Sequence, residues 1–176
     1  MADRDRHLFA PILVMGVSAC GKSEIASRLA ATIEVPFVEG DALHPPSNTD
    51  KMSRGVPLED EDRWPWLNAL ADEVEALAAE KGGAVFSCSA LKQSYRSRLR
   101  ARLPDLITVY LKLDPETAQN RAAGRNGHFM PAALVESQFA TLECPRGEQN
   151  TVLVDARMPI EEILDRIHPA VLQLAV

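Results

Sequence analysis

The residues best suited to chemistry in this sequence form a glycine-rich stretch near its beginning. Residues 16–23 read G-V-S-A-C-G-K-S, which matches G-x-x-x-x-G-K-[ST], the phosphate-binding loop of nucleotide-hydrolysing and phosphoryl-transferring proteins. An apolar run, 11–15, precedes the stretch, and 24–31 is typical of a helix. Glycines allow the tight turn, and backbone N–H groups at a helix N-terminus bind phosphate oxygens. The pattern predicts a site for a nucleoside triphosphate.

Two side chains of this loop have predicted roles of their own. Lys22 would pair with the β- and γ-phosphates, and the Ser23 hydroxyl would ligate Mg²⁺. The alternative is a glycine-rich turn between a strand and a helix, with an exposed lysine. The predicted phosphate contacts are Gly16, Val17, Ser18, Ala19, Cys20, Gly21, Lys22 and Ser23.

Strand-like and helix-like segments alternate along the rest of the chain. The expected strands are 11–15, 35–38, 84–88, 106–111 and 151–154. The expected helices are 24–31, 64–81 and 92–103, followed by helices that begin at 114–115, at 131 and after 159. Short apolar strands separated by helices predict an α/β fold, a five-stranded parallel sheet covered by helices on both faces. We expect residues 1–176 to form a single domain.

Composition narrows the possible partners and the compartment. The chain has 176 residues, 46% of them hydrophobic, and a net charge of −6. This charge argues against a nucleic-acid-binding surface. Three cysteines without metal-ligand spacing favour a reducing compartment. We expect no membrane partner and a cytoplasmic location, because no apolar run approaches the ~20 residues that span a bilayer.

Ligands of parallel α/β sheets bind at the carboxyl ends of the strands, so the segments that follow the other strands are the next place to search. After the second strand, Asp41 would orient and deprotonate an attacking hydroxyl. Glu39 or Asp41 would contact Mg²⁺ through water, and His44 would hydrogen-bond a substrate hydroxyl. The alternative for Asp41 is an acid that caps a turn.

Two basic residues farther along are candidates for an anionic substrate. Arg63 would bind a carboxylate in bidentate fashion, or it forms a surface ion pair with the acids around it. Lys92 is expected in the first turn of a helix, where the macrodipole disfavours a cation unless an anion binds there. We therefore expect Lys92 to contact a carboxylate or a phosphate.

Residues 121–131 are predicted to form a short lid. Arg121 and Arg125 have helical i, i+4 spacing and would close over the phosphates as arginine fingers. The alternative is a solvated pair near Glu116.

Taken together, the motifs resemble those of the gluconokinase family of small phosphate-loop kinases. The resemblance extends over nearly the whole chain. It consists of G-V-S-x-x-G-K-S at 16–23, G-D-x-L-H-P at 40–45, N-x-x-K-M at 48–52, D-x-D-R-x-P-W-L at 60–67, C-S-A-L-K-x-x-Y-R at 88–96, Y-L-K at 110–112, G-R-x-G-H-F at 124–129 and Q-F-x-T-L-E at 138–143. Ala19-Cys20 replaces a more usual Gly-Ser, and Glu39 stands where many relatives have Asp.

This resemblance implies a three-layer fold similar to adenylate and shikimate kinases. It also implies transfer of the γ-phosphoryl group of ATP to the 6-hydroxyl of D-gluconate, often by a homodimer. By matched position, the resemblance implies that residues 16–23 and Arg125 contact ATP and that Asp41, His44, Arg63 and Lys92 lie near the sugar acid. We also expect Arg121 to contact ATP, and Arg96 and His128 to contact the substrate. The expected catalytic residues are Lys22, Asp41 and Arg125.

Other functions remain open at this point. A kinase for another small hydroxy acid, such as shikimate, or for a nucleoside monophosphate would share the phosphate loop. A GTPase-like switch is disfavoured, because the chain has no N/T-K-x-D motif to read guanine.

Overall fold

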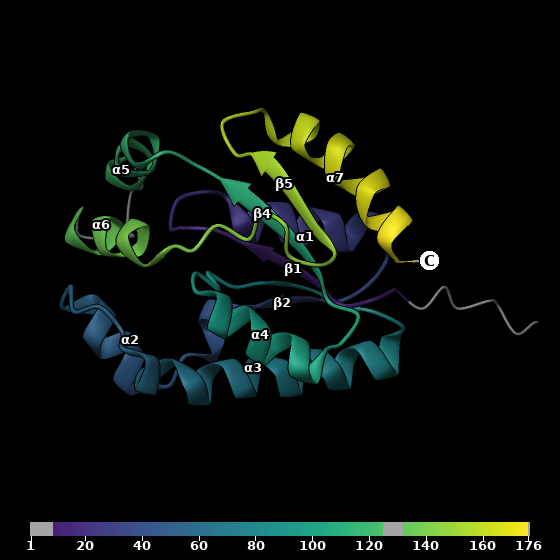
Figure 1. The fold of residues 1–176 in the computed structure, drawn as a ribbon, viewed down its shortest axis with the longest axis horizontal. Helices are drawn as coiled ribbons and strands as arrows, with labels where there is room; N and C mark the ends of the chain where they lie inside the picture. Colours follow the sequence, from purple (N-terminus) through teal and green to yellow (C-terminus); the bar gives the residue numbers. More distant parts are fainter. Residues whose placement is uncertain (1–8, 125–131, 176) are drawn as a thin grey trace, which may run out of the picture.

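The structure is a computed structural model that describes residues 9–124 and 132–175. In these residues, five short strands form one parallel sheet at the centre of the fold (Figure 1). The strands are β1 (Ile12–Met15), β2 (Phe37–Glu39), β3 (Val85–Ser87), β4 (Ile107–Lys112) and β5 (Thr151–Asp155). Their order across the sheet is β2-β3-β1-β4-β5, and every neighbouring pair is parallel. The predicted five-stranded parallel sheet is confirmed.

Two faces of the sheet pack against different helices. The helices are α1 (Lys22–Thr32), α2 (Pro46–Ser53), α3 (Asp60–Lys81), α4 (Gln93–Arg102), α5 (Pro115–Ala123), α6 (Ala132–Thr141) and α7 (Ile160–Leu174). In Figure 1, α1 and α7 lie on one side of the sheet, and α3 and α4 lie on the other. The three layers expected from the sequence are therefore present.

The alternation of side chains along β1 shows why the sheet needs cover on both faces. Ile12 and Val14 belong to the core that contains residues of α1 and α7, whereas Leu13 and Met15 belong to the core that contains residues of α3 and α4. All four side chains are buried. Successive strand residues point to opposite faces, so a strand that is apolar throughout stabilises both layers.

The remaining helices gather at one end of the sheet. The arrowheads of the strands in Figure 1 point toward the end of the molecule where α2, α5 and α6 lie. This end carries the carboxyl ends of the strands, where parallel α/β sheets bind their ligands. Within the described residues, no helix combines the length and the apolar character needed to cross a membrane.

The segment between β2 and β3 contains more structure than the sequence analysis predicted. A short 3-10 helix, η1 (Gly40–Leu43), and α2 follow β2 directly. Helix α3 begins at Asp60, four residues before the predicted start. The carboxylates of Glu59 and Asp62 form a capping box at this end, which satisfies N–H groups that would lack partners in the first turn.

Gly40, the first residue of η1, lies very close to β3. A Cβ atom on this residue would lie 2.0 Å from the Ser87 carbonyl oxygen, a backbone atom that cannot rotate away. Its own carbonyl accepts a hydrogen bond of 2.8 Å from Nε1 of Trp66. Only glycine therefore fits between β3 and α3 at this position.

We expect Gly40→Ala to lower the free energy of unfolding by about 2–4 kcal/mol, because the added methyl group must displace backbone. Gly124→Ala is the matched control: a Cβ atom there meets its nearest neighbour at 3.6 Å, an ordinary contact. The control should change stability by less than about 1 kcal/mol. Urea denaturation of both variants measures the difference, and equal stability of the two would contradict this account of Gly40.

Candidate active site

The phosphate loop connects β1 to α1 and has the backbone conformation that an anion site requires. Ala19 and Gly21 have positive φ angles of 66° and 93°, which turn the chain sharply before α1 begins at Lys22. A Cβ atom on Gly16 would lie 2.8 Å from Sγ of Cys20 and 2.9 Å from the Leu111 carbonyl oxygen. The first N–H groups of a helix have no intrahelical acceptors, so this end of α1 is suited to phosphate oxygens.

Lys22 lies where the sequence predicts. Its side chain is largely buried, with 9% of the residue exposed, and Nζ lies 3.5 Å from the Val17 carbonyl oxygen within the loop. Ser23 is exposed beside it at the start of α1. The loop thus places an ammonium group and a hydroxyl next to the backbone amides.

A contact that the sequence analysis did not predict ties this loop to α6. The Ser18 N–H group donates a 2.7 Å hydrogen bond to Oε1 of Gln138, and Nε2 of Gln138 donates to Oγ of Ser18 at 3.0 Å. Gln138 is the first residue of the Q-F-x-T-L-E motif, and its place in that motif is the only feature of the sequence that points to this contact. Helix α6 is therefore joined to the loop across 120 residues of chain.

The second strand delivers Asp41 and His44 to the same edge of the sheet. The side chain of Asp41 is 61% exposed, and its Oδ1 lies 3.9 Å from Nε2 of His44. The imidazole is stacked on the Trp66 ring, with 3.9 Å between centroids and 21° between planes. Helix α3 thus holds His44 in place and leaves the Asp41 carboxylate accessible.

The charges of three predicted site residues converge on Cys88, the buried residue just after β3. Burial raises the pKa of the Cys88 thiol to about 12, and the negative charge of Asp41 raises it as well. The positive charges of Lys22 and Arg63 act in the opposite direction on the same pKa. Charged groups from three different segments of the chain therefore act on the pKa of the same buried thiol.

Arg63 and Lys92 differ in how much of their charge is available. Nε of Arg63 donates to the Leu58 carbonyl oxygen at 3.3 Å, and its terminal nitrogens have no hydrogen-bond or ion-pair partner among the described residues. In contrast, Nζ of Lys92 donates to Oδ1 of Asp60 at 2.8 Å. The terminal N–H groups of Arg63 are therefore available to a substrate carboxylate, whereas the ammonium group of Lys92 is already paired with the carboxylate of Asp60.

Lys92 is the N-cap of α4, one residue before the first turn in which it was expected. Oδ1 of Asp60 also accepts a 2.5 Å hydrogen bond from the Tyr95 hydroxyl. The hydrogen bonds from Lys92 and Tyr95 lower the pKa of Asp60. Asp60, which the sequence analysis did not single out, therefore stays ionised and fixes the lysine at this helix end.

Arg96 does not have the geometry of the predicted substrate contact. Its side chain is fully buried, and Nε and Nη2 donate to the Glu148 carboxylate. Nη1 donates to the Ala90 and Leu91 carbonyl oxygens, and Nη2 also donates to the carbonyl oxygen of Glu143. No donor remains for a sugar acid, so the arrangement corrects our expectation: Arg96 holds the segment that contains 143–148 against α4.

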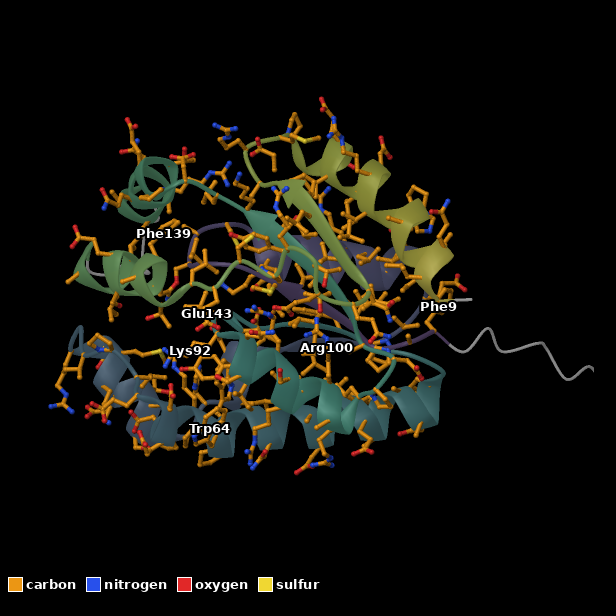
Figure 2. All side chains as sticks on the ribbon, viewed as in Figure 1. Phe9, Trp64, Lys92, Arg100, Phe139 and Glu143 are labelled. Atoms are coloured by element: carbon orange, nitrogen blue, oxygen red, sulfur yellow. The ribbon has the colours of Figure 1, made fainter. Side chains whose placement is uncertain are left out.

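Glu143, at the end of the Q-F-x-T-L-E motif, adds to this connection. Its carboxylate accepts a 2.5 Å hydrogen bond from the Gln93 N–H group at the start of α4, and its own N–H group donates to the Leu91 carbonyl oxygen at 2.8 Å. Figure 2 shows Glu143 and Lys92 near each other at the boundary between α4 and the chain that follows α6. The motif therefore closes one side of the site.

The predicted lid is only partly within the described residues. Arg121 belongs to α5, and its Nη2 donates to the Ala156 carbonyl oxygen at 3.0 Å, just after β5. This bond holds Arg121 at the carboxyl edge of the sheet, and its contact with phosphate stays a prediction. Arg125 and His128 lie outside the described residues, so their roles stay predictions.

Oxygen atoms suited to Mg²⁺ are present, but few. Glu39 accepts a hydrogen bond from the Ser87 hydroxyl, while the Ser23 hydroxyl and the Asp41 carboxylate are exposed. Across residues 9–124 and 132–175, no group of three or more His, Cys, Asp or Glu side chains is placed to hold a metal ion. This donor set fits a hard cation that takes most of its ligands from phosphates and water.

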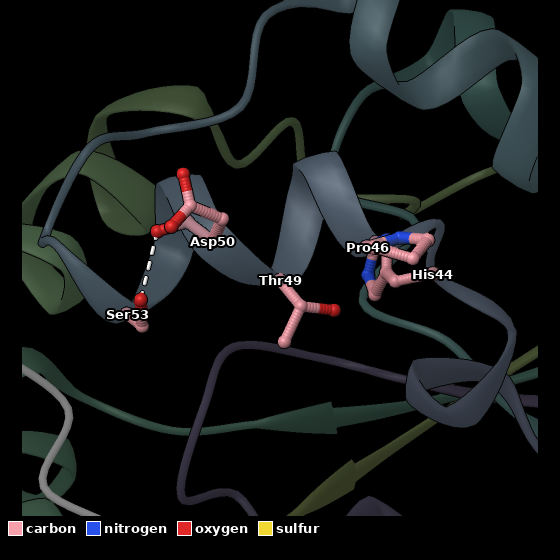
Figure 3. A pocket seen from close by; sticks show the side chains of 5 residues that line it. All are labelled: His44, Pro46, Thr49, Asp50 and Ser53. Atoms are coloured by element: carbon pink, nitrogen blue, oxygen red, sulfur yellow. Dashed lines mark hydrogen bonds between the residues drawn. The ribbon is translucent and has the colours of Figure 1, made fainter.

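A recess of about 490 Å³ opens beside His44 and α2 (Figure 3). It is lined by His44, Pro46, Thr49, Asp50 and Ser53. The Ser53 hydroxyl donates to the Asp50 carbonyl oxygen at 2.8 Å. Helix α2, which the sequence analysis missed, therefore forms one wall next to His44.

A phosphate loop after the first strand of a parallel sheet, with an exposed carboxylate after the second strand at the same edge, is typical of a P-loop kinase. The chain is 43% identical over 163 residues to the thermosensitive gluconokinase of Escherichia coli K12, covering 92% of this chain and 87% of that protein. It is also 43% identical over 158 residues to the gluconokinase of Gluconobacter oxydans, covering 89% and 88%. The chain belongs to the gluconokinase family.

Further comparisons agree with this assignment. The sequence profile of a family described as an AAA domain matches residues 12–145. A gluconokinase structure from Sinorhizobium meliloti is 46% identical, with a TM-score of 0.86 over 96% of this chain and 94% of that one. The APS kinase of Mycobacterium tuberculosis, 18% identical with a TM-score of 0.68 over 92% and 96%, shares the fold.

We expect the stability of the protein to depend on pH through His44. Burial lowers the pKa of this histidine from 6.5 to about 4, although Asp41 acts to raise it. Between these values the unfolded chain binds a proton that the folded chain does not, so the free energy of unfolding falls as the pH falls through this window. At pH 5, protonation of His44 in the unfolded chain should lower the free energy of unfolding by on the order of 1–2 kcal/mol.

Denaturation at pH 7 and pH 5 of the wild type and of His44→Gln measures this contribution. The variant should lose less stability than the wild type over this interval, since glutamine does not titrate. An equal loss in both proteins would show that His44 is not held neutral by the fold.

Proposed function

We propose that this protein transfers the γ-phosphoryl group of ATP to the 6-hydroxyl of D-gluconate, giving 6-phospho-D-gluconate and ADP. The observation that carries the proposal is the arrangement at one edge of the parallel sheet, where the phosphate loop with Lys22 follows β1 and the exposed Asp41 follows β2. The relatives named gluconokinase match along most of the chain. The acceptor is a sugar acid, which offers one carboxylate and several hydroxyls.

Each part of the substrate pair has residues of matching chemistry. The amides of residues 16–23 and Lys22 would bind the phosphates of ATP. The open fork of Arg63 would bind the carboxylate of gluconate in bidentate fashion. Asp41, exposed at the same edge, would position the attacking hydroxyl and accept its proton as the new phosphate ester forms. Arg121 and Arg125 are proposed to stabilise the charge of the transferring group.

Mg²⁺ is part of this proposal. The Ser23 hydroxyl would hold it directly, and Glu39 or Asp41 would do so through water. When bound, the ion neutralises charge on the phosphates. Lys92 and His128 remain proposed contacts of the acceptor. A homodimer and a cytoplasmic location remain predictions.

An ADP-release assay with a panel of acceptors tests the function. Purified protein with ATP and Mg²⁺ should release ADP when D-gluconate is added, and much less with shikimate or nucleoside monophosphates. Chelation of Mg²⁺ should abolish release. Binding of ATP without release of ADP on addition of gluconate would contradict the proposal.

We expect Lys22→Ala and Asp41→Asn each to lower kcat at least about tenfold while the fold persists, since each removes a group that acts on the reacting atoms. Asp72→Asn is the matched control for Asp41, because it removes a carboxylate of nearly equal exposure on α3, 62% against 61%. The control should retain wild-type kcat. Full kcat in Asp41→Asn would exclude this carboxylate from the mechanism.

A further inference from the structure

Asn48 is a buried polar residue that lies beside the site without a role in it so far. It belongs to α2 and opens the N-x-x-K-M motif, and only 1% of its surface is exposed. Its Nδ2 atom donates a 2.8 Å hydrogen bond to the Asp62 carbonyl oxygen. The same atom lies 3.2 Å from Nδ1 of His44. One amide nitrogen therefore joins the start of α3 to the imidazole.

The chemistry of these partners fixes the direction of both hydrogen bonds. A carbonyl oxygen only accepts, so the Asp62 contact requires the nitrogen end of the Asn48 amide at this position. An amide nitrogen carries two hydrogens and accepts none, so its contact with His44 requires Nδ1 to be the acceptor. A ring nitrogen that accepts has no proton, and the proton of the neutral imidazole must then be on Nε2.

The environment of the ring supports the neutral form. The side chain of His44 is 4% exposed and stacks on Trp66. Burial lowers its pKa to about 4, so at neutral pH the ring carries a single N–H group. A 180° flip of the ring would put Cδ2 in the place of Nδ1, so it would break the contact with Asn48.

The remaining N–H group faces the acceptor side of the site. Nε2 of His44 lies 3.9 Å from Oδ1 of Asp41, farther than a direct hydrogen bond allows. A hydroxyl placed between the two groups could accept from Nε2 and donate to the carboxylate. This arrangement orients an alcohol whose proton passes to Asp41.

We propose that Asn48 is a positioning residue that fixes His44 as a hydrogen-bond donor beside Asp41. The effect on turnover rests on the proposed function, whereas the tautomer of His44 does not. The simpler alternative is that Asn48 only attaches α2 to α3 through Asp62. Lys51 provides a control for that alternative, because its Nζ bonds both carboxylate oxygens of Asp62 at 2.8 and 2.7 Å and has no contact with His44.

The first experiment reads the tautomer directly. In protein labelled with ¹⁵N-histidine, His44 is assigned by its absence in His44→Gln, and its ring nitrogens are observed at pH 7 without substrates. The wild type should carry a proton on Nε2 and none on Nδ1. Asn48→Asp presents carboxylate oxygens to Nδ1, so Nδ1 should gain a proton, while Lys51→Met should leave the wild-type pattern.

The second experiment separates positioning from attachment of α2. With gluconate and ATP, Asn48→Asp should lower kcat about tenfold or more, with KM for ATP within about twofold, because the donor beside Asp41 is lost. Lys51→Met should keep kcat within about twofold to threefold, even where thermal denaturation shows that it loses as much stability. Equal losses of kcat in the two variants would support attachment alone and overturn the proposal.

The wild-type spectrum keeps the proposal testable if Asn48→Asp does not fold. A proton on Nδ1 of His44 in the wild-type protein overturns it without any variant. A wild type with the expected tautomer but no activity on gluconate would contradict the proposed function and leave the role of Asn48 toward His44 standing.

Discussion

All five strands run in the same direction, and this constraint places the ends of β1, β2 and β3 at one edge of the sheet. Each strand then contributes what its following segment carries: the phosphate loop after β1, Asp41 and His44 after β2, and Cys88 after β3. Because η1 follows β2 directly and begins with Gly40, its backbone can pass close to Ser87 of β3. Phosphoryl transfer requires the phosphate donor and the acceptor hydroxyl to lie side by side. The common direction of the strands provides this placement, and the side chains then act within it.

The electrostatic design of the site follows from the acidity of the chain. With a net charge of −6, most cations have carboxylates available, and the structure pairs them: Lys92 with Asp60, and Arg96 with Glu148. A buried guanidinium group requires such a partner, because an unpaired buried charge is very unfavourable. Arg63 differs in that its terminal nitrogens are left open among the described residues. Its guanidinium group lies over the Tyr95 ring, 5.4 Å from the centroid, and this contact leaves the terminal N–H groups available to a carboxylate.

The sequence predicts local features of this fold well and long-range pairing poorly. The apolar runs around 12–15 and 107–111 and the cap at Asp114 follow from local patterns, and the structure confirms them. Helix α2 was missed because it is eight residues long and mostly polar, so no apolar periodicity marks it. Arg96 was misassigned for a different reason. Its partner, Glu148, is 52 residues away, and a basic helix gives no sign of which arginine is buried. Gln138 and Asn48 were likewise visible only as letters of motifs, since their contacts join separate elements.

The two halves of the site differ in how far they depend on side-chain identity. Phosphates would be bound mainly by backbone amides, whose positions depend on the turn before α1, so Ala19 and Cys20 can occupy loop positions without supplying a polar group. The residues proposed for the acceptor side act through their side chains instead. Their placement depends on directed side-chain contacts, such as the stack of His44 on Trp66 and its hydrogen bond with Asn48. Since α3 supplies Trp66 and Arg63 as well as the carbonyl of Asp62, the entry of this one helix sets the geometry on which recognition of the acceptor depends.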